Sequence, residues 1–408
     1  MRISSFGCRL HGGSSARLVM AFMLALVMAR SAWTQAKSFQ EMFDAYVKTD
    51  GIVGASYVAL DRGTTTTAQH IGMADRDGNQ VVDANTIFHW ASITKTLTAV
   101  AVMQLRDRGR LSLDDPIVKY VPELRRVHSE NGEIEKVTLR HLLSHSSGFQ
   151  SPTWPYRDDR KPWQPFEPTE WSQLVAMMPY QELSFAPGTR FQYSNPGFIY
   201  LARVIEALTG DPYETYVQKN ILTPLGMTRS YFNISPYHLA ADRSNNYTIY
   251  TGADGQQVKP NGREFDTGIT TPNGGLNAPL ADLARWVAFL AGRDSSAMIL
   301  DRRSLEEMWR PVVEVTGEPA VGETYMGLSF FLYPRGSGVD KITFVGHTGH
   351  QAAFRTFMVF NPKNGRAVIA AFNTAHDDDS QTPAAEAAFR RSNDGFNDLI
   401  ARALEELR

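Results

Sequence analysis

The spacing of the hydrophobic residues changes twice along this chain. Near the start, residues 52–60 and 64–71 alternate apolar and polar side chains as the two strands of a hairpin do. From residue 111 to about 294 the pattern is mostly helical, with loops rich in proline and glycine between the helices. The strand pattern then returns in residues 325–333, 342–345, 353–360 and 367–372. We therefore expect one sheet built from both parts, with a helical lobe inserted between them.

The expected fold belongs to the α/β (α+β) class, an antiparallel sheet flanked by helices with an inserted all-helical lobe. The sheet lobe is predicted at about residues 37–91 and 295–408, and the helical lobe at about 92–294. Residues 93–105 are apolar on nearly every side and lack glycine and proline, which predicts a buried helix with Ser92 in its first turn. A final helix is predicted at residues 384–407, with an interruption near Gly395.

The first 36 residues have the pattern of a secretory signal peptide. Arginines precede an apolar run at residues 18–29, and Thr34, Gln35 and Ala36 offer small residues for cleavage. The run is shorter than the roughly 18 to 20 apolar residues that a membrane-spanning helix needs. We expect an exported protein, periplasmic or secreted, of residues 37–408 and without a stable membrane anchor.

Charge and cysteine content exclude several classes of function for the exported part. Removing residues 1–36 takes away four arginines and no acidic residue, so the formal charge moves from −2 to −6. No basic excess favours nucleic acid as a partner. The single cysteine, Cys8, lies in the predicted signal peptide, which leaves no thiol for disulfides, thiolate catalysis or a cysteine-ligated metal.

Ser92 and Lys95 lie three residues apart at the start of the predicted buried helix, so their side chains share one face. An amine at that place lowers the cost of deprotonating the serine hydroxyl. No other lysine in the chain has a serine three residues before it. The alternative interpretation is a serine that caps the helix and a solvated lysine.

Tyr193-Ser194-Asn195 supplies a phenol that can act as acid or base and an amide that can hold a substrate carbonyl or the lysine. The same spacing recurs at Tyr231-Phe232-Asn233, where a turn with a hydrogen-bonded asparagine is the preferred interpretation. The first copy is favoured by its setting, because a Pro187-Gly188 turn precedes it and an apolar helix begins near Gly197.

His347-Thr348-Gly349 follows the predicted strand 342–345. At a strand end, these residues can lay backbone N–H groups and a hydroxyl along a substrate. The alternative is a polar strand end whose glycine permits close packing.

Taken together and in this order, the three motifs make the chain resemble the serine β-lactamases and penicillin-binding DD-peptidases, in particular the class C β-lactamase and family VIII carboxylesterase branch. The resemblance runs from about residue 39 to 372. It includes further segments at residues 111–116, 141–148, 187–189 and 273–276.

The resemblance implies a serine hydrolase that forms an acyl-enzyme on Ser92, with Lys95 and Tyr193 sharing the activating proton. It implies that Asn195 positions the substrate and that the backbone N–H groups of Ser92 and His350 hold the oxyanion. The partner would be a small-molecule or peptide substrate, with no metal or organic cofactor, and the oligomeric state stays open. An alternative is a non-catalytic penicillin-binding or sensor-type protein of the same fold.

Two departures from the family pattern bear on the substrate. His347 stands where many β-lactamases of this group have a lysine, whose fixed charge helps to bind the substrate carboxylate. A histidine at this position resembles the pattern of some DD-peptidases, D-aminopeptidases and esterases of the family. His350 and Ala353 replace smaller residues that often follow this motif. A β-lactam, a D-Ala peptide, a carboxylic ester and a D-amino-acid amide all stay open as substrates.

Other patterns in the chain favour structural interpretations. Asp266-Thr267-Gly268 matches the aspartic-protease tripeptide but has no second copy. His141 and His145, four apart on a predicted helix, lack a third zinc ligand at a supporting spacing. No Gly-x-Ser-x-Gly elbow occurs, and residues 376–379 are predicted to be a solvated loop. The loop at residues 154–166, with several aromatics and prolines, either forms a wall of the substrate pocket or packs onto the helical lobe.

Overall fold

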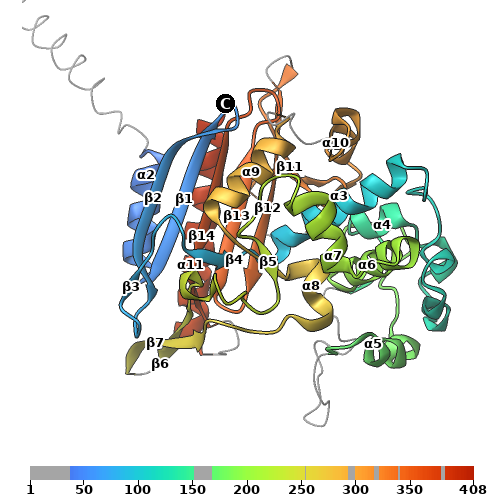
Figure 1. Ribbon diagram of the computed structural model, residues 1–408, viewed down its shortest axis with the longest axis horizontal. Helices are drawn as coiled ribbons and strands as arrows, with labels where there is room; N and C mark the ends of the chain where they lie inside the picture. Colours follow the sequence, from blue (N-terminus) through green and yellow to red (C-terminus); the bar gives the residue numbers. More distant parts are fainter. Residues whose placement is uncertain are drawn as a thin grey trace, which may run out of the picture.

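The computed structural model describes residues 37–150, 168–252, 254–292, 299–316, 321–338, 341–377 and 382–408. The predicted signal peptide and the loop at residues 154–166 lie outside these ranges. Within them, a central sheet has helices on both of its faces (Figure 1).

The main sheet has nine strands, and every strand runs antiparallel to its neighbours. It joins the early strands of the chain to the late ones, because β1 pairs with β14 in the register Ala55↔Phe372. The predicted antiparallel sheet made of two separated parts of the chain is confirmed. In spatial order the strands are β3 (Gln80–Val81), β2 (Thr64–Asp75), β1 (Gly54–Asp61), β14 (Ala367–Phe372), β13 (Phe354–Phe360), β12 (Ile342–Gln351), β11 (Phe331–Arg335), β10 (Tyr325–Met326) and β9 (Val313–Glu314).

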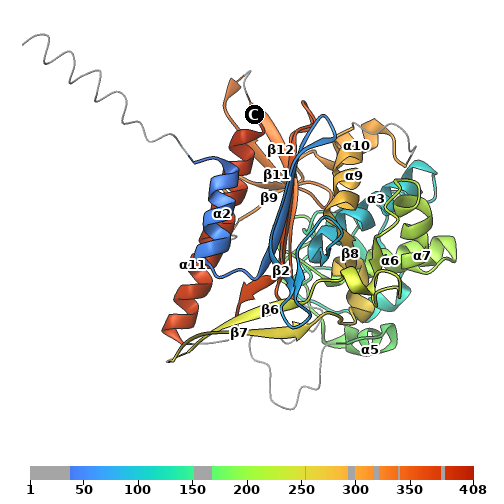
Figure 2. The ribbon, with the colours of Figure 1, turned by 60° about the vertical axis from the view of Figure 1, so that its left-hand side comes forward.

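Both faces of the sheet are covered (Figure 2). Helices α2 (Phe39–Thr49) and α11 (Pro383–Glu406) lie on one face, while α3 (Thr94–Asp107) and α9 (Leu280–Leu290) lie on the other. The alternation of side chains along β1 serves both cores, because Tyr57 packs with the α2 and α11 side and Val58 with the opposite side. A sheet buried on both faces fixes the position of every strand between two layers of helices.

The middle of the chain contains strands that the sequence analysis missed. Residues 111–294 were predicted as mostly helical, but two small sheets include residues from this part. One joins β4 (Ile87–His89), β8 (Leu276–Pro279) and β5 (Tyr231–Phe232), and the other joins β15 (Thr374–His376), β6 (Asn246–Gly252) and β7 (Gly255–Gly262). The exact division into a sheet lobe and a helical lobe stays a prediction. The other α-helices are α4 (Leu139–Leu143), α5 (Trp171–Met177), α6 (Pro196–Thr209), α7 (Tyr213–Val217), α8 (Thr271–Gly274) and α10 (Arg302–Met308).

Helix α3 is the buried helix that the sequence predicts. Every residue from Thr94 to Leu105 is buried, including Lys95. The hydroxyls of its buried threonines form hydrogen bonds within the protein; for example, Thr98 Oγ1 donates to the Pro272 carbonyl at 2.7 Å. This helix therefore holds Thr94 and Lys95, the end of the Ser92 motif, in the interior.

Two predictions about element boundaries were wrong. Helix α11 continues through Gly395 without interruption. A Cβ at this position would lie only 2.9 Å from the Tyr46 ring, so the glycine permits the close contact with α2. The predicted strand 325–333 is two short strands, β10 and β11. They are joined by a tight turn in which Ser329 has φ of 68° and the Gly327 N–H donates to the Phe330 carbonyl.

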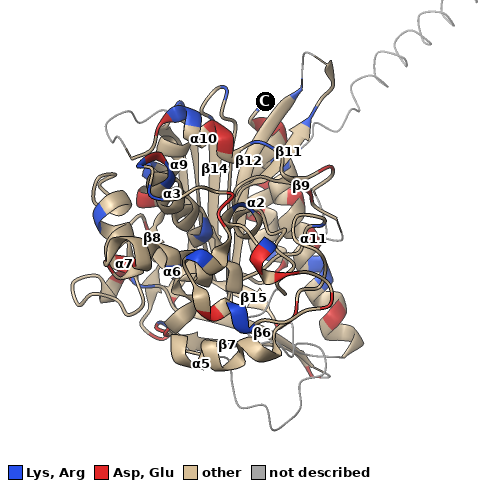
Figure 3. Ribbon diagram, turned by 90° about the vertical axis from the view of Figure 1, so that its right-hand side faces the viewer, with Lys and Arg blue, Asp and Glu red and all other residues tan. Residues whose placement is uncertain are grey.

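Charged residues of both signs are interspersed over the side of the molecule shown in Figure 3. Among the residues that the structure describes, no helix combines the length and the apolar character needed to cross a membrane.

Candidate active site

A tight turn between β4 and α3 presents Ser92. The Trp90 N–H donates to the Leu276 carbonyl at 2.8 Å, and Ala91 then adopts a φ of 47°, which is uncommon for a residue with a side chain. Ser92 follows in a single 3₁₀ turn (Ala91–Ile93) that leads directly into α3. Residues held in such conformations cluster at functional sites. The half-buried Ser92 side chain is thus fixed at the end of a buried helix.

Lys95 lies one helical turn further and its amine reaches back to the serine. Its Nζ is 3.0 Å from Ser92 Oγ and donates to the Asn273 carbonyl at 2.8 Å. The amine also lies 4.8 Å from the centroid of the Tyr193 ring. In the described part of the chain, no carboxylate forms an ion pair with it. Burial therefore lowers the pKa of Lys95 well below its ordinary value, which favours the neutral amine.

Tyr193 is held against Lys95 by a histidine that the sequence analysis did not assign to the site. The His145 ring stacks on Tyr193 with centroids 4.2 Å apart and an interplanar angle of 21°. The Ser194 N–H donates to His145 Nδ1 at 3.0 Å, so the proton of the neutral ring sits on Nε2. Burial, reinforced by the nearby Lys95 and His347, lowers the pKa of His145 well below its ordinary value.

The zinc alternative for His141 and His145 finds no support in this geometry. His145 lies outside α4 with a φ of 54°, whereas His141 caps the start of α4 through the Thr138 N–H. The described residues contain no group of three or more histidine, cysteine or acidic side chains placed to hold a metal ion. His145 therefore serves the tyrosine loop.

Asn195 and Asn273 connect the tyrosine loop to the lysine. Asn195 is the residue immediately before α6, and its carbonyl accepts a 3.5 Å hydrogen bond from Asn273 Nδ2. The carbonyl of the same Asn273 accepts from Lys95. Sequence reasoning missed Asn273 as a site residue, although it opens one of the segments that carry the family resemblance.

The sequence predicts the His347-Thr348-Gly349 motif just after a strand that ends at residue 345. In the structure the strand is longer, and the motif lies within β12. Pairing with β13 continues to Gln351↔Phe354, whereas β11 pairs only as far as Gly346. A Cβ at Gly349 would lie 2.3 Å from the Trp90 carbonyl oxygen. The glycine therefore lets β12 approach the turn that presents Ser92, which is the close-packing role considered for it.

Neighbouring residues of β12 point to opposite faces of the sheet. His347 faces the lysine side, where its ring centroid is 6.4 Å from that of Tyr193. Its Nδ1–H donates to the Thr348 carbonyl at 2.6 Å, so Nε2 carries the lone pair and has no hydrogen-bond partner among the described residues. Burial, with a smaller contribution from Lys95, lowers the pKa of His347 to about 3. His350 is exposed farther along the strand.

The second copy of the tyrosine motif is structural, as expected. Asn233 Oδ1 accepts hydrogen bonds from the hydroxyls of Thr267 and Thr271. Asp266 accepts a 2.8 Å hydrogen bond from the Gly268 N–H, which makes its tripeptide a turn. Neither segment contributes a side chain to the Ser92 site.

The chain is similar to known proteins over most of its length. The family model described as Beta-lactamase matches residues 39–391. Esterase EstB of Burkholderia gladioli is 32% identical over 197 residues, which cover 46% of this chain and 48% of that protein. Protein flp of Staphylococcus aureus (strain COL) is 25% identical over 338 residues, and the match covers 82% of this chain but only 63% of flp.

Solved structures give the same fold. A penicillin-binding protein homologue from Pyrococcus abyssi, described as octameric, superposes with a TM-score of 0.69 at 28% identity, over 82% of this chain and 73% of its own. A class C beta-lactamase in complex with cefoxitin superposes with a TM-score of 0.70 at 20% identity, over 90% of this chain and 98% of its own.

Proposed function

Because the chain belongs to the Beta-lactamase family, we propose that it is a serine hydrolase in which Ser92 forms an acyl-enzyme with a carboxylic ester or amide. Family and fold support serine hydrolase activity in general. The observation that carries the proposal is the buried Lys95 amine 3.0 Å from Ser92 Oγ, in surroundings that favour its neutral form. A neutral amine has a lone pair that can accept the serine proton.

The proposed reaction begins when Ser92 Oγ attacks the substrate carbonyl and its proton moves to Lys95 Nζ. That proton then passes from Lys95 through Tyr193, which lies next to the amine, to the leaving group, and Asn195 positions the substrate. The backbone N–H groups of Ser92 and His350 hold the oxyanion; a donor of this kind is worth about 10²- to 10³-fold in rate. Water then gives a proton to Lys95 and Tyr193 as it attacks the acyl-enzyme, and this proton returns to Ser92 Oγ when the acid leaves.

The preferred substrate in this proposal is an uncharged carboxylic ester. His347 supports this choice, because a buried histidine with a pKa of about 3 carries no charge at neutral pH to attract a substrate carboxylate. The esterase relative supports it by its name. We place the enzyme outside the cytoplasm on the strength of the predicted signal peptide.

The test compares the protein of residues 37–408 with its Ser92→Ala variant on p-nitrophenyl butyrate and on a chromogenic cephalosporin. Rates of release and the mass of any covalent adduct are measured. We expect ester turnover that falls at least about 10³-fold in the variant, together with loss of the acyl adduct. Ser112→Ala, at an exposed serine, is the matched control.

Three results would contradict the proposal in different ways. Ester turnover that survives Ser92→Ala refutes the nucleophile. Faster release from the cephalosporin than from the ester refutes the substrate preference. A stable adduct on Ser92 without turnover favours the penicillin-binding or sensor-type alternative.

A further inference from the structure

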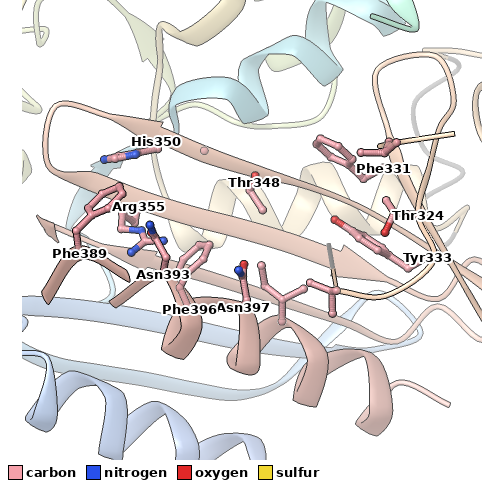
Figure 4. A pocket seen from close by; sticks show the side chains of 14 residues that line it. Thr324, Phe331, Tyr333, Thr348, His350, Arg355, Phe389, Asn393, Phe396 and Asn397 are labelled. Carbon is pink, nitrogen blue, oxygen red and sulfur yellow. The ribbon is translucent and has the colours of Figure 1, made fainter. Parts of the chain in front are cut away.

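A buried histidine connects the end of β12 to the chain just before Ser92. His350, the next-to-last residue of β12, lies where the strand turns towards β13 (Figure 4). The last residue, Gln351, has its side-chain amide 3.0 Å from Nε2 of His89. His89 is the last residue of β4, lies three residues before Ser92 and is only 1% exposed. One side-chain contact thus joins the two segments that supply the proposed oxyanion donors.

The other nitrogen of His89 determines the direction of this hydrogen bond. Asn277 donates from Nδ2 to two backbone carbonyls, so its Oδ1 accepts from His89 Nδ1 at 2.9 Å. Burial, with the nearby Arg243, lowers the pKa of His89 to about 4, so the ring is neutral at pH 7. Its Nε2 then carries the lone pair and accepts from Gln351, whose amide nitrogen this network places towards the ring.

A glycine in the segment that binds the Lys95 amine makes room for Gln351. A Cβ at Gly274 would lie only 2.5 Å from Gln351 Oε1. The same Cβ would lie 3.8 Å from the Ala91 carbonyl carbon, which is an ordinary contact distance. Gly274 follows Asn273, whose carbonyl accepts from the lysine at 2.8 Å. The Gln351 side chain therefore meets this segment next to the turn that presents the serine.

The two proposed oxyanion donors belong to distant parts of the chain, so their separation depends on how these parts are held. The backbone and indole N–H groups of Trp90 hold the serine turn, because they donate to the Leu276 and Ala278 carbonyls of β8, both at 2.8 Å. In the described part of the chain, the last residues of β12 pair with β13 on one side and with no strand on the other. The hydrogen bond from Gln351 to His89 holds this strand end, and a displacement of about 1 Å at a reacting group costs about 10²-fold in rate.

We propose that Gln351 is a positioning residue, which holds the His350 N–H at the correct distance from the Ser92 N–H through its hydrogen bond to His89. This inference rests on the proposed function, because it concerns the oxyanion of the Ser92 reaction. Loss of the hydrogen bond is expected to act on the transition state, in which the oxyanion develops its charge, more than on substrate binding.

The experiment compares wild type with Gln351→Met, which keeps the length of the side chain and removes the hydrogen bond. Both proteins, of residues 37–408, are assayed on p-nitrophenyl butyrate. We expect kcat to fall at least about tenfold and KM to change less than about twofold. Gln257→Met, at an exposed glutamine, is the matched control and is expected to leave both constants unchanged.

An inhibitor that resembles the tetrahedral intermediate gives a second measurement. In butylboronic acid, the boron binds Ser92 Oγ while the serine proton passes to Lys95, and one boron-bound oxygen takes the place of the oxyanion. Its inhibition constant is expected to rise at least about tenfold in Gln351→Met. A general loss of packing would instead weaken the substrate and the inhibitor to similar extents.

Gly274→Ala tests the same contact without changing Gln351, because the added Cβ must displace the glutamine side chain. We expect kcat to fall at least about fivefold in wild type. In the Gln351→Ala background, where no long side chain meets the Cβ, the same substitution is expected to change kcat less than about twofold. Circular dichroism and melting temperature check that each variant is folded.

Three results would overturn this inference alone. They are a kcat of Gln351→Met equal to that of a wild type that hydrolyses the ester, an unchanged inhibition constant for butylboronic acid, and equal losses from Gly274→Ala in both backgrounds. No ester turnover in wild type, or turnover that survives Ser92→Ala, overturns the proposed function and this inference with it.

Discussion

The neutral state of His347 predicts how the stability of this protein depends on pH. Its pKa is lowered from 6.5 to about 3 in the folded protein, mainly by burial. The unfolded chain therefore binds a proton near pH 6.5 that the folded protein does not accept until about pH 3. The stability linked to neutral His347 is therefore fully present above pH 6.5 and is lost as the pH falls towards the pKa of the folded protein, about 3.

The size of the effect follows from these two values. The full shift corresponds to about 5 kcal/mol, at 1.36 kcal/mol for each pKa unit. Between pH 7.5 and pH 5.0 only the unfolded state titrates, and the loss assigned to His347 is about 2 kcal/mol. His347→Asn, which has no titrating ring, lacks this part of the pH dependence. His89 and His145 stay in both proteins, so their contributions cancel to a first approximation.

The assay is urea unfolding at equilibrium, followed by tryptophan fluorescence at pH 7.5 and pH 5.0. Wild type is expected to lose about 2 kcal/mol more free energy of unfolding than His347→Asn over this interval. His128→Asn, at an exposed histidine, controls for the loss of any histidine. Parallel losses in wild type and His347→Asn would refute the argument that burial keeps His347 neutral.

Two further residues give predictions that single variants test. Lys95→Met is expected to abolish ester turnover. It is also expected to raise the free energy of unfolding at pH 7, because below pH 10.5 wild type must release the lysine proton in order to fold, and this gain shrinks as the pH approaches 10.5. A free energy of unfolding at pH 7 that is unchanged or lower would contradict this. In wild type, the kcat for the ester is expected to decrease as the pH is lowered through the lowered pKa of Lys95, because the protonated amine cannot accept the serine proton. A kcat that stays constant down to pH 4 would indicate another base. Gly349→Ala places a Cβ 2.3 Å from the Trp90 carbonyl and is expected to lower kcat at least about tenfold, whereas the control Gly252→Ala meets no atom within 4 Å and is expected to leave kcat unchanged.

The larger features of the fold could be predicted because they leave long patterns in the sequence. The buried helix α3 comes from an apolar run without glycine or proline, and the strands of the main sheet come from alternation or from short apolar runs. Strand β7 leaves no such pattern, because nearly all its residues are exposed. Gly395 shows a different limit, since a glycine that permits a helix contact and one that breaks a helix look the same in sequence.

For the candidate site, the sequence predicts which motifs come together better than how their side chains interact. The three motifs meet in one site because α3, the loop before α6 and β12 converge there. The stacking of His145 on Tyr193 has no local signal, because the two rings belong to separate loops. The low pKa of His347 depends on burial by distant residues, which spacing along the chain does not reveal.

The pairing of β1 with β14 also sets the order in which this protein can be completed during synthesis. Ala55 pairs with Phe372, so β1 can pair with β14 only after about 300 further residues have left the ribosome. Until then, one edge of β1 has no neighbour, and an unpaired edge invites aggregation. The strand that packs against the Ser92 turn also comes from this late part of the chain. A nascent chain therefore contains Ser92 long before the turn that presents it has its neighbour in β12.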